Sequence, residues 1–250
     1  MTTQGLPRLV SIRVWGDFAC VTRPELKAER VSYPVLTPSA ARGVLEAIFF
    51  EPQMFYIIHE IGVVRRGRWF SFRRNEVAKV VSLRDAARAM EGSGAGGLAP
   101  IQAGGGAPDA TQRGMLALAD VEYLITAEIR LTRRAEPPRD NLDKYLELFI
   151  HRATRGKCFH RPYLGCREFD AHFAYVPDAS TISLCAGEWP KEDLGLMLYD
   201  VFDPRDRDSG QSARPTPVFF HAEIRDAKLD CHPDRVRLVR RAVPDREVMS

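Results

Sequence analysis

Two short blocks of sequence contain the residues best suited to chemistry on a phosphodiester. Residues 155–169 crowd cations, aromatic rings and glycines into fifteen positions, and residues 15–50 carry a cationic loop followed by a helix. Cations neutralise phosphates, aromatic rings stack on unpaired bases, and glycines let a backbone approach RNA closely. Because a plain core needs no such mixture, the blocks predict RNA contacts. The cationic candidates are Arg23, Lys27, Arg30, Arg155, Lys157, Arg161 and Arg167.

Both blocks resemble the CRISPR-associated Cas5 family, specifically its subtype I-C (Dvulg) branch. The matching segments are GDFACVTRPELKAERVSYPVLTPSAARGVLEAIFF and GKCFHRPYLGCREF. The resemblance implies a protein that binds CRISPR repeat RNA and holds the 5′ handle of the mature crRNA. It also implies contacts with the backbone and large subunits of a crRNA-guided effector complex. In this branch the protein commonly cuts the precursor RNA as well.

Metal-independent RNA cleavage needs a base for the 2′-hydroxyl proton, a cation for the phosphorane and an acid for the leaving 5′-oxygen. The resemblance implies a tyrosine near the end of the first helix and a Lys-His pair at the start of the second. Here the first position holds Phe49, and the second holds Lys144 followed by Tyr145. Phe49 can stack on RNA or simply extend the helix core, but it has no hydroxyl. Tyr33 and Tyr56 carry hydroxyls, although nothing in the sequence places either beside Lys144.

Other residues of the second half can supply acid–base groups. Lys144, His151 and Arg155 are spaced seven and four apart, so on a helix they share one face. The alternative interpretation of this stripe is a solvated basic surface. His160 lies inside the second block and is the other acid–base candidate, against the alternative of a structural histidine. The predicted catalytic set is therefore Lys144, His151 and His160.

Two further groups of residues bear on the site. Arg73 and Arg74 lie on the outer face of a predicted hairpin arm, where they can grip phosphates, while Trp69 and Phe72 can stack on bases or belong to the core. For Arg23, Lys27 and Arg30 the alternative is a set of surface ion pairs with Glu25 and Glu29, each worth under ~1 kcal/mol.

No metal or cofactor is expected. Cys158 and Cys166 are eight apart, with His160 between them, a spacing that does not match a structural zinc site. The glycine run at 104–106 lacks the spacing of a nucleotide-binding loop.

Periodicity and capping residues predict the elements that position these blocks. Thr37 suits a helix cap with Pro38 in the first helical position, and that helix should end near Phe50 because Pro52 follows closely. Asn141 suits the cap of a second helix. The predicted order is a strand at 9–15, a helix at 38–50, a strand at 54–64, a hairpin arm at 69–81, a strand at 121–131 and a helix from 142 to about 155, ended by Gly156.

This order is the split βαβ arrangement of a ferredoxin-like (RRM-like) α+β domain, predicted for residues 1–175. Glycine and alanine dominate residues 92–106, which predicts a flexible insertion at about 88–112. Short apolar runs at 182–185, 218–225 and 236–243 predict a small antiparallel β subdomain over residues 176–250.

Composition fits a protein of this kind. The 250 residues carry a formal net charge of +3 and five cysteines without CxxC spacing, which favours reduced thiols in the cytoplasm. No apolar run approaches about 18 residues, so no membrane segment is expected. The leading prediction is a repeat-RNA-binding subunit that also processes precursor crRNA without a metal. The alternatives are a non-catalytic scaffold that holds the crRNA handle, and an unrelated ferredoxin-like module that binds other RNA.

Overall fold

The strand β5 (Ala110–Leu131) is the centre of the sheet, and its partners explain the arrangement of the rest. It pairs antiparallel with β1 (Leu9–Ala19), β3 (Met54–Arg65) and β4 (Arg68–Val77), and parallel with the short β2 (Arg30–Val31). The computed structural model describes residues 8–26, 28–78, 81–91, 101–102, 104, 106–203 and 216–240.

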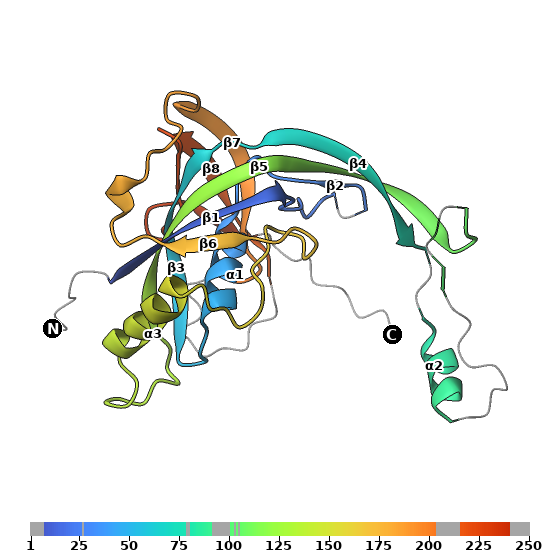
Figure 1. Ribbon diagram of the computed structural model, residues 1–250, viewed down its shortest axis with the longest axis horizontal. Helices are drawn as coiled ribbons and strands as arrows, with labels where there is room; N and C mark the ends of the chain where they lie inside the picture. Colours follow the sequence, from blue (N-terminus) through green and yellow to red (C-terminus); the bar gives the residue numbers. More distant parts are fainter. Residues whose placement is uncertain are drawn as a thin grey trace.

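Two helices cover one side of this sheet. β6 (His172–Tyr175) pairs with the outer edge of β1, so the central strand order is β3-β5-β1-β6. Strand β2 and then helix α1 (Pro38–Ile48) connect β1 to β3, and α3 (Leu142–Thr154) connects β5 to β6. Both helices lie on the same side of the strands (Figure 1). The fold is therefore a mixed α/β arrangement with few helices and a mostly antiparallel sheet.

The helix predictions are confirmed at both ends. The Thr37 side chain accepts a hydrogen bond from the backbone N–H of Ala40, and the Asn141 side chain accepts one from the backbone N–H of Lys144. These caps satisfy N–H groups that have no partner inside their helix. Phe49 is already extended after α1, and Gly156 has the left-handed φ of +65° after α3.

A two-stranded ribbon extends from the sheet, and α2 (Leu83–Met90) lies beyond its far end (Figure 1). The ribbon joins β4 to the first half of β5, which confirms the predicted hairpin arm. The predicted strand at 121–131 is too short, because β5 begins at Ala110. The first half of β5 pairs with β4 in the exposed ribbon, and the ribbon residues carry no core-like periodicity from which a strand could be predicted. α2 was not predicted. Within the predicted insertion at about 88–112, residues 92–100, 103 and 105 lie outside the described residues, and α2 and β5 occupy its two ends.

The C-terminal strands continue the same sheet. The additional elements are η1 (Ala179–Thr181), β7 (Lys191–Asp200), β8 (Val218–Arg225), β9 (Lys228–Asp230) and β10 (Leu238–Arg240). β9 pairs with β3, so the sheet runs β10-β8-β9-β3-β5-β1-β6, with β7 on β8. Trp189, Met197 and Phe220 belong to the same buried cluster as Leu45 and Ile61.

Strand predictions in this part had mixed outcomes. The strand at 218–225 is confirmed, and the run at 236–243 contains β10 within its described residues. The run at 182–185 is wrong, because those residues form no strand; the Cys185 N–H instead donates a single hydrogen bond to the carbonyl of Val63. The boundary between residues 175 and 176 stays a prediction. No helix in the described ranges combines the length and apolar character needed to cross a bilayer.

Candidate functional site

The loop that follows α3 brings the two sequence blocks together. The backbone N–H of Cys20 donates to the carbonyl of Leu164 at 2.9 Å, at the end of β1. The backbone N–H of Phe159 donates to the carbonyl of Ala47 at 2.7 Å, at the end of α1. Arg30 also donates to the Cys166 sulfur at 3.2 Å. Residues 156–169 are therefore fixed between β1, β2 and α1.

The C-terminal end of α1 is the meeting point of this arrangement. The last carbonyls of a helix have no partner within it. Here the carbonyl of Ala47 is bonded by the loop, that of Ile48 accepts from Arg152 Nε at 2.8 Å, and that of Phe49 accepts from the Tyr56 hydroxyl at 2.8 Å. The loop, α3 and β3 thus all contact the same helix end.

An open cavity of about 560 Å³ lies at this junction. That volume is within the range of about 300–1,000 Å³ typical of small-molecule sites, and it can admit a nucleotide. Its walls come from α1 and the residues after it, from α3 and from the loop. The lining residues are Gly43, Glu46, Ile48, Phe49, Phe50, Glu51, Arg152, Phe159, His160 and Tyr163.

His160 and Tyr163 form the polar side of the loop wall. Their rings lie nearly parallel, at 26°, with centroids 6.3 Å apart. The His160 Nδ1 is 3.1 Å from the carbonyl of Arg161. When Nδ1 carries the proton and donates to that carbonyl, Nε2 keeps the lone pair that a general base requires.

The cavity also contains a cation and a hydroxyl that the sequence analysis did not select. Arg152 reaches it from α3 while its Nε is bonded to the carbonyl of Ile48, and Tyr163 contributes a half-buried phenol. Tyr163 lies in the same Arg-Pro-Tyr segment as Arg161, so its position in the sequence could have identified it as a site residue. The sequence position of Arg152 gave no such indication, because only the packing of α3 on α1 brings this residue to the cavity.

Phe49 both packs and lines the cavity. Its side chain is 8% exposed, its ring lies 6.3 Å from that of Tyr145, and it forms part of the cavity wall. The packing interpretation is therefore confirmed, and stacking of Phe49 on RNA stays a prediction.

The other tyrosine hydroxyls near this region are occupied. Burial raises the pKa of Tyr56 well above its usual value, and its hydroxyl is bonded to the carbonyl of Phe49. Burial and then the neighbouring Asp140 raise the pKa of Tyr145 to about 12, and its hydroxyl donates to Asp140 at 2.6 Å. The Tyr33 hydroxyl accepts from the backbone N–H of Leu198. These three phenols serve the fold, which leaves Tyr163 as the phenol that lines the cavity.

Two of the predicted catalytic residues do not line the cavity. Lys144 Nζ lies 3.2 Å from a carboxylate oxygen of Asp140, and it sits over the Tyr145 ring. His151 is exposed on the last turn of α3, where Arg155 contacts its ring at 3.2 Å from Nδ1. The structure thus brings His151 and Arg155 together, as their spacing predicted, and pairs Lys144 with an acid.

Several predicted RNA-binding cations form ion pairs. Arg30 lies 3.8 Å from Glu168 and 3.9 Å from Glu76, and Arg74 contacts the same two acids. Arg23 lies over the Tyr33 ring, with its guanidinium carbon 4.6 Å from the ring centroid.

The pairing of the remaining cations differs from residue to residue. Arg23 is also 3.8 Å from Glu25, as the ion-pair alternative predicted, and Arg161 lies 3.3 Å from Asp170. Within the described ranges, no ion pair is found for four exposed cations of the predicted set, and Lys27 lies outside those ranges. The four are Arg73, Arg155, Lys157 and Arg167.

The ribbon presents aromatic rings to solvent. Trp69 is 51% exposed and Phe70 is 43% exposed. Phe72 is half-buried, with its ring 5.6 Å from that of Phe70 and 6.3 Å from that of Phe169. These rings are available for stacking rather than confined to the main core.

Comparison with known proteins identifies the family. The profile described as CRISPR-associated protein (Cas_Cas5) matches residues 9–232. A protein of Mannheimia succiniciproducens named CRISPR pre-crRNA endoribonuclease Cas5d is 38% identical over 235 residues, which cover 93% of this chain and 98% of that protein. A Thermus thermophilus protein with the same name is 41% identical over 242 residues, which cover 88% and 90%. The chain belongs to the CRISPR-associated Cas5 family, as the two blocks indicated.

Solved structures share the fold. A crystal structure of a CRISPR-associated protein matches with a TM-score of 0.61 at 19% identity, over 90% of this chain and 94% of that chain. A functionally uncharacterized protein from Streptococcus mutans, SMU1763c, matches with a TM-score of 0.61 at 18% identity, over 93% and 97%. The arrangement of strands and helices is thus shared at low sequence identity.

Replacing Gly165 with alanine will detach the loop from β1, whereas the same change at Gly156 will not. Both glycines have left-handed φ, +87° and +65°, which costs an alanine about 1–2 kcal/mol. Only at Gly165 does an added Cβ meet the backbone, 2.1 Å from the carbonyl oxygen of Cys20; at Gly156 nothing lies within 4 Å. The clash adds about 1–3 kcal/mol. Urea unfolding of the two variants measures the difference, and equal losses would show that the loop does not depend on this contact.

Proposed function

We propose that this protein is a CRISPR type I-C endoribonuclease that processes precursor crRNA without a metal and stays on the 5′ handle in the effector complex. The observation that carries the proposal is the cavity where His160, Tyr163 and Arg152 meet, at the junction of the two blocks. The names of the two relatives, each matching most of this chain, support the same activity. Its partners would be the repeat RNA, the mature crRNA, and the backbone and large subunits of the complex.

The fold supports RNA binding of this kind. We infer that β1-α1-β3-β5-α3-β6 is the split βαβ of a ferredoxin-like domain, since the antiparallel order β3-β5-β1-β6 is the one that this arrangement gives. Residues 1–175 would form the RNA-binding unit, and residues 176–250 its β-rich extension. Reduced cysteines suit work in the cytoplasm.

The cavity residues can share the three tasks of cleavage. His160 Nε2 takes the proton of the 2′-hydroxyl, and the 2′-oxygen attacks phosphorus. Arg152 stabilises the negative charge that develops on the phosphorane. The bond from phosphorus to the 5′-oxygen breaks as Tyr163 gives its proton to that oxygen. The products are a 2′,3′-cyclic phosphate and a 5′-hydroxyl.

The remaining predicted residues would bind RNA outside the reacting centre. Lys144 and His151 lie along α3, and they extend the cationic surface away from the cavity. Cations with no acidic partner are the best phosphate contacts, because no ion pair must be broken first. Those already paired with acids would exchange partners on binding. The proposed RNA-binding set is Arg23, Lys27, Arg30, Phe49, Arg73, Arg74, Arg155, Lys157, Arg161 and Arg167.

A non-catalytic scaffold that holds the crRNA handle is the second candidate. Phe49 favours it, because this residue lines the cavity without a hydroxyl at the position where the family resemblance implies a catalytic tyrosine. In the nuclease proposal, Tyr163 supplies that hydroxyl from the loop.

Incubation of the purified protein with end-labelled repeat RNA in EDTA separates the two candidates. We expect discrete cleavage within the repeat, leaving a 5′-hydroxyl and a 2′,3′-cyclic phosphate. Tight, hairpin-selective binding without cleavage would overturn the nuclease proposal and support the scaffold. Binding that follows salt concentration but not the repeat hairpin would overturn both.

A further inference from the structure

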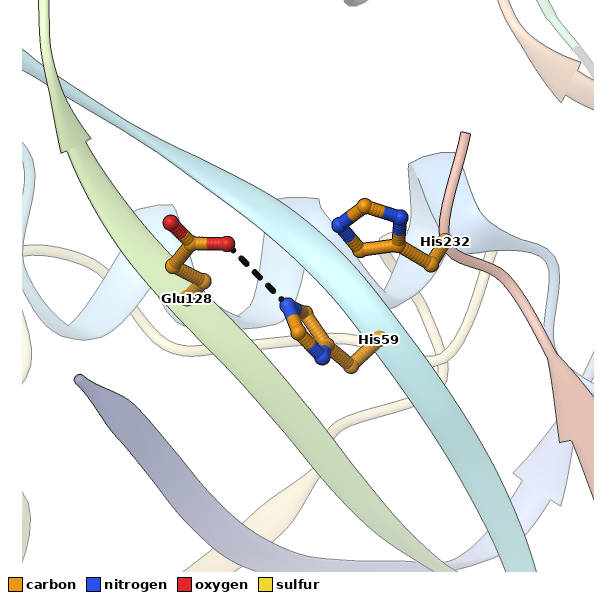
Figure 2. Close-up of side chains that lie close together, drawn as sticks. All are labelled: His59, Glu128 and His232. Carbon is orange, nitrogen blue, oxygen red and sulfur yellow. Dashed lines mark hydrogen bonds and ion pairs between the residues drawn. The ribbon is translucent and has the colours of Figure 1, made fainter. Parts of the chain in front are cut away.

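A second cluster of chemically capable side chains lies outside the cavity, where β3, β5 and the segment after β9 meet (Figure 2). His59, Glu128 and His232 each offer one ligand atom, and these atoms lie within 4.8 Å of one another. We propose that the three residues bind a divalent transition metal ion, with zinc as the test ion. Two imidazoles and one carboxylate form a donor set that zinc accepts, with a fourth position left for water.

The distances are close to those that a zinc ion needs. Ligands at about 2.0–2.1 Å from zinc in a tetrahedron lie about 3.3 Å from each other. His59 Nε2 is 3.1 Å from Glu128 Oε2, so this edge of the tetrahedron is nearly formed. The ring of His232 lies edge to face with that of His59, at 75° and with centroids 4.5 Å apart. The His232 ligand atom lies within 4.8 Å of the other two, and its approach to about 3.3 Å completes the set.

Three hydrogen bonds hold the third ligand in place. The N–H of Cys231 donates to the carbonyl of His59 at 2.9 Å, and Arg235 Nη2 donates to the same carbonyl at 3.0 Å. The N–H of His232 donates to Asp230 Oδ1 at 3.1 Å. Since these bonds tie the residues around His232 to His59 itself, the two imidazoles are kept side by side without a metal.

A bulge directs the first ligand. Between β3 and β5, Ile58 is paired with Ala127 and Glu60 with Thr126, so His59 is an extra residue on its strand. Bulges of this kind re-aim side chains and are common next to functional sites. Here the bulge lets His59 reach Glu128 on the neighbouring strand.

The surroundings suit ligation. The three side chains are 13%, 16% and 11% exposed, so the site is shielded but still reachable from solvent. Arg130 donates to both oxygens of Glu128, at 2.9 and 3.2 Å. A carboxylate has about four lone-pair sites, so Oε2 can hold Arg130 and a metal together.

Nε2 is the nitrogen of His232 that can bind the metal. Nδ1 accepts a hydrogen bond from the backbone N–H of Asp234 at 3.3 Å and lies 3.8 Å from the carboxylate of the same residue. In the part of the chain that the structure describes, Nε2 of His232 has no hydrogen-bond partner, and Figure 2 shows this edge of the ring turned toward the other two residues. With a metal on Nε2, the ring proton moves to Nδ1, the contact with the Asp234 N–H is given up, and the Asp234 carboxylate accepts that proton instead, the usual arrangement around a ligating histidine.

A metal at this position would join β3, β5 and the C-terminal segment. None of the three ligands lines the cavity assigned to RNA cleavage. The ion would therefore stabilise the fold and take no part in the reaction, and the inference does not rest on the proposed function.

Zinc titration of metal-free full-length protein tests the proposal. Calorimetry should show one zinc ion bound per chain. The Tm should rise with zinc. His232→Gln should weaken zinc binding at least about tenfold and remove the rise in Tm. His221→Gln, a change at an exposed histidine on β8, should leave both unchanged.

Two further readouts keep the test decisive. The Tm of metal-free His232→Gln should match that of the metal-free parent, which shows that the variant folds. The chain also carries cysteines, so cobalt(II) in place of zinc tests which side chains bind the metal. Binding by histidine and carboxylate should give visible d–d bands without a thiolate-to-metal band. Zinc bound equally well by His232→Gln, a strong thiolate band, or no binding by the parent would each overturn the proposal.

Discussion

Replacing His160 with alanine will slow cleavage of repeat RNA by about 10²–10⁴-fold, the usual contribution of a positioned acid–base group. The dissociation constant for the RNA should change little, because His160 is one exposed side chain in a surface with many cations. The loss of cleavage rate is expected because His160 lines the cavity, where its ring is stacked on that of Tyr163 and its Nδ1 is turned to the carbonyl of Arg161. Single-turnover cleavage rates and binding titrations on the same RNA measure the two quantities separately.

Three matched variants sharpen this result. Tyr163→Phe removes only the hydroxyl and should also reduce the rate, with binding retained. His151→Ala, on the exposed face of α3, should reduce the rate less than His160→Ala, because His151 lies outside the cavity. His221→Ala, on β8, should cleave like the parent. Full activity of His160→Ala would remove it from catalysis, and a larger loss at His151 would move the reacting centre to α3.

The local features of this protein could be predicted from sequence, and the tertiary ones could not. Helices α1 and α3 begin at Thr37 and Asn141 because a capping side chain acts within its own first turn. The loop around His160 was recognisable because its cations, rings and glycines are contiguous. Arg152 was missed as a site residue, because only the packing of α3 against the end of α1 brings it to the cavity, whereas Tyr163 lies inside the recognised loop and could have been selected.

Charge pairing shows the same limit. The sequence offered Glu25 and Glu29 as partners of the first cationic loop, because they are neighbours in the chain. Arg23 does meet Glu25, but Arg30 is paired instead with Glu76 on the ribbon and Glu168 on the loop. In the same way, His59 and His232 became neighbours only because β9 pairs with β3.

Arg42→Ala will destabilise the protein by about 3–5 kcal/mol, because it leaves a buried carboxylate without its cation. Arg42 Nε and Nη2 donate to the two oxygens of Asp200 at 2.9 and 3.1 Å, and Nη1 donates to Glu46 at 2.7 Å. The Arg42 and Asp200 side chains are 15% and 6% exposed. Since α1 carries Arg42 and β7 carries Asp200, the loss separates the helix that lines the cavity from the C-terminal strands.

Thermal unfolding should show this loss as a fall in Tm of roughly 10 °C, given about 2–4 °C per kcal/mol for a chain of this size. Arg225→Ala breaks another arginine–carboxylate pair, with Glu223, but on an exposed strand face, and its Tm should stay at the parent value. The double change Arg42→Met with Asp200→Leu should recover part of the stability, because it removes the buried Asp200 charge together with its cation, whereas Glu46, with its side chain 24% exposed, keeps its charge without Arg42. If Arg42→Ala instead unfolds at the parent temperature, the pair does not hold α1 against β7, and the geometry of the cavity must be fixed by the loop contacts alone.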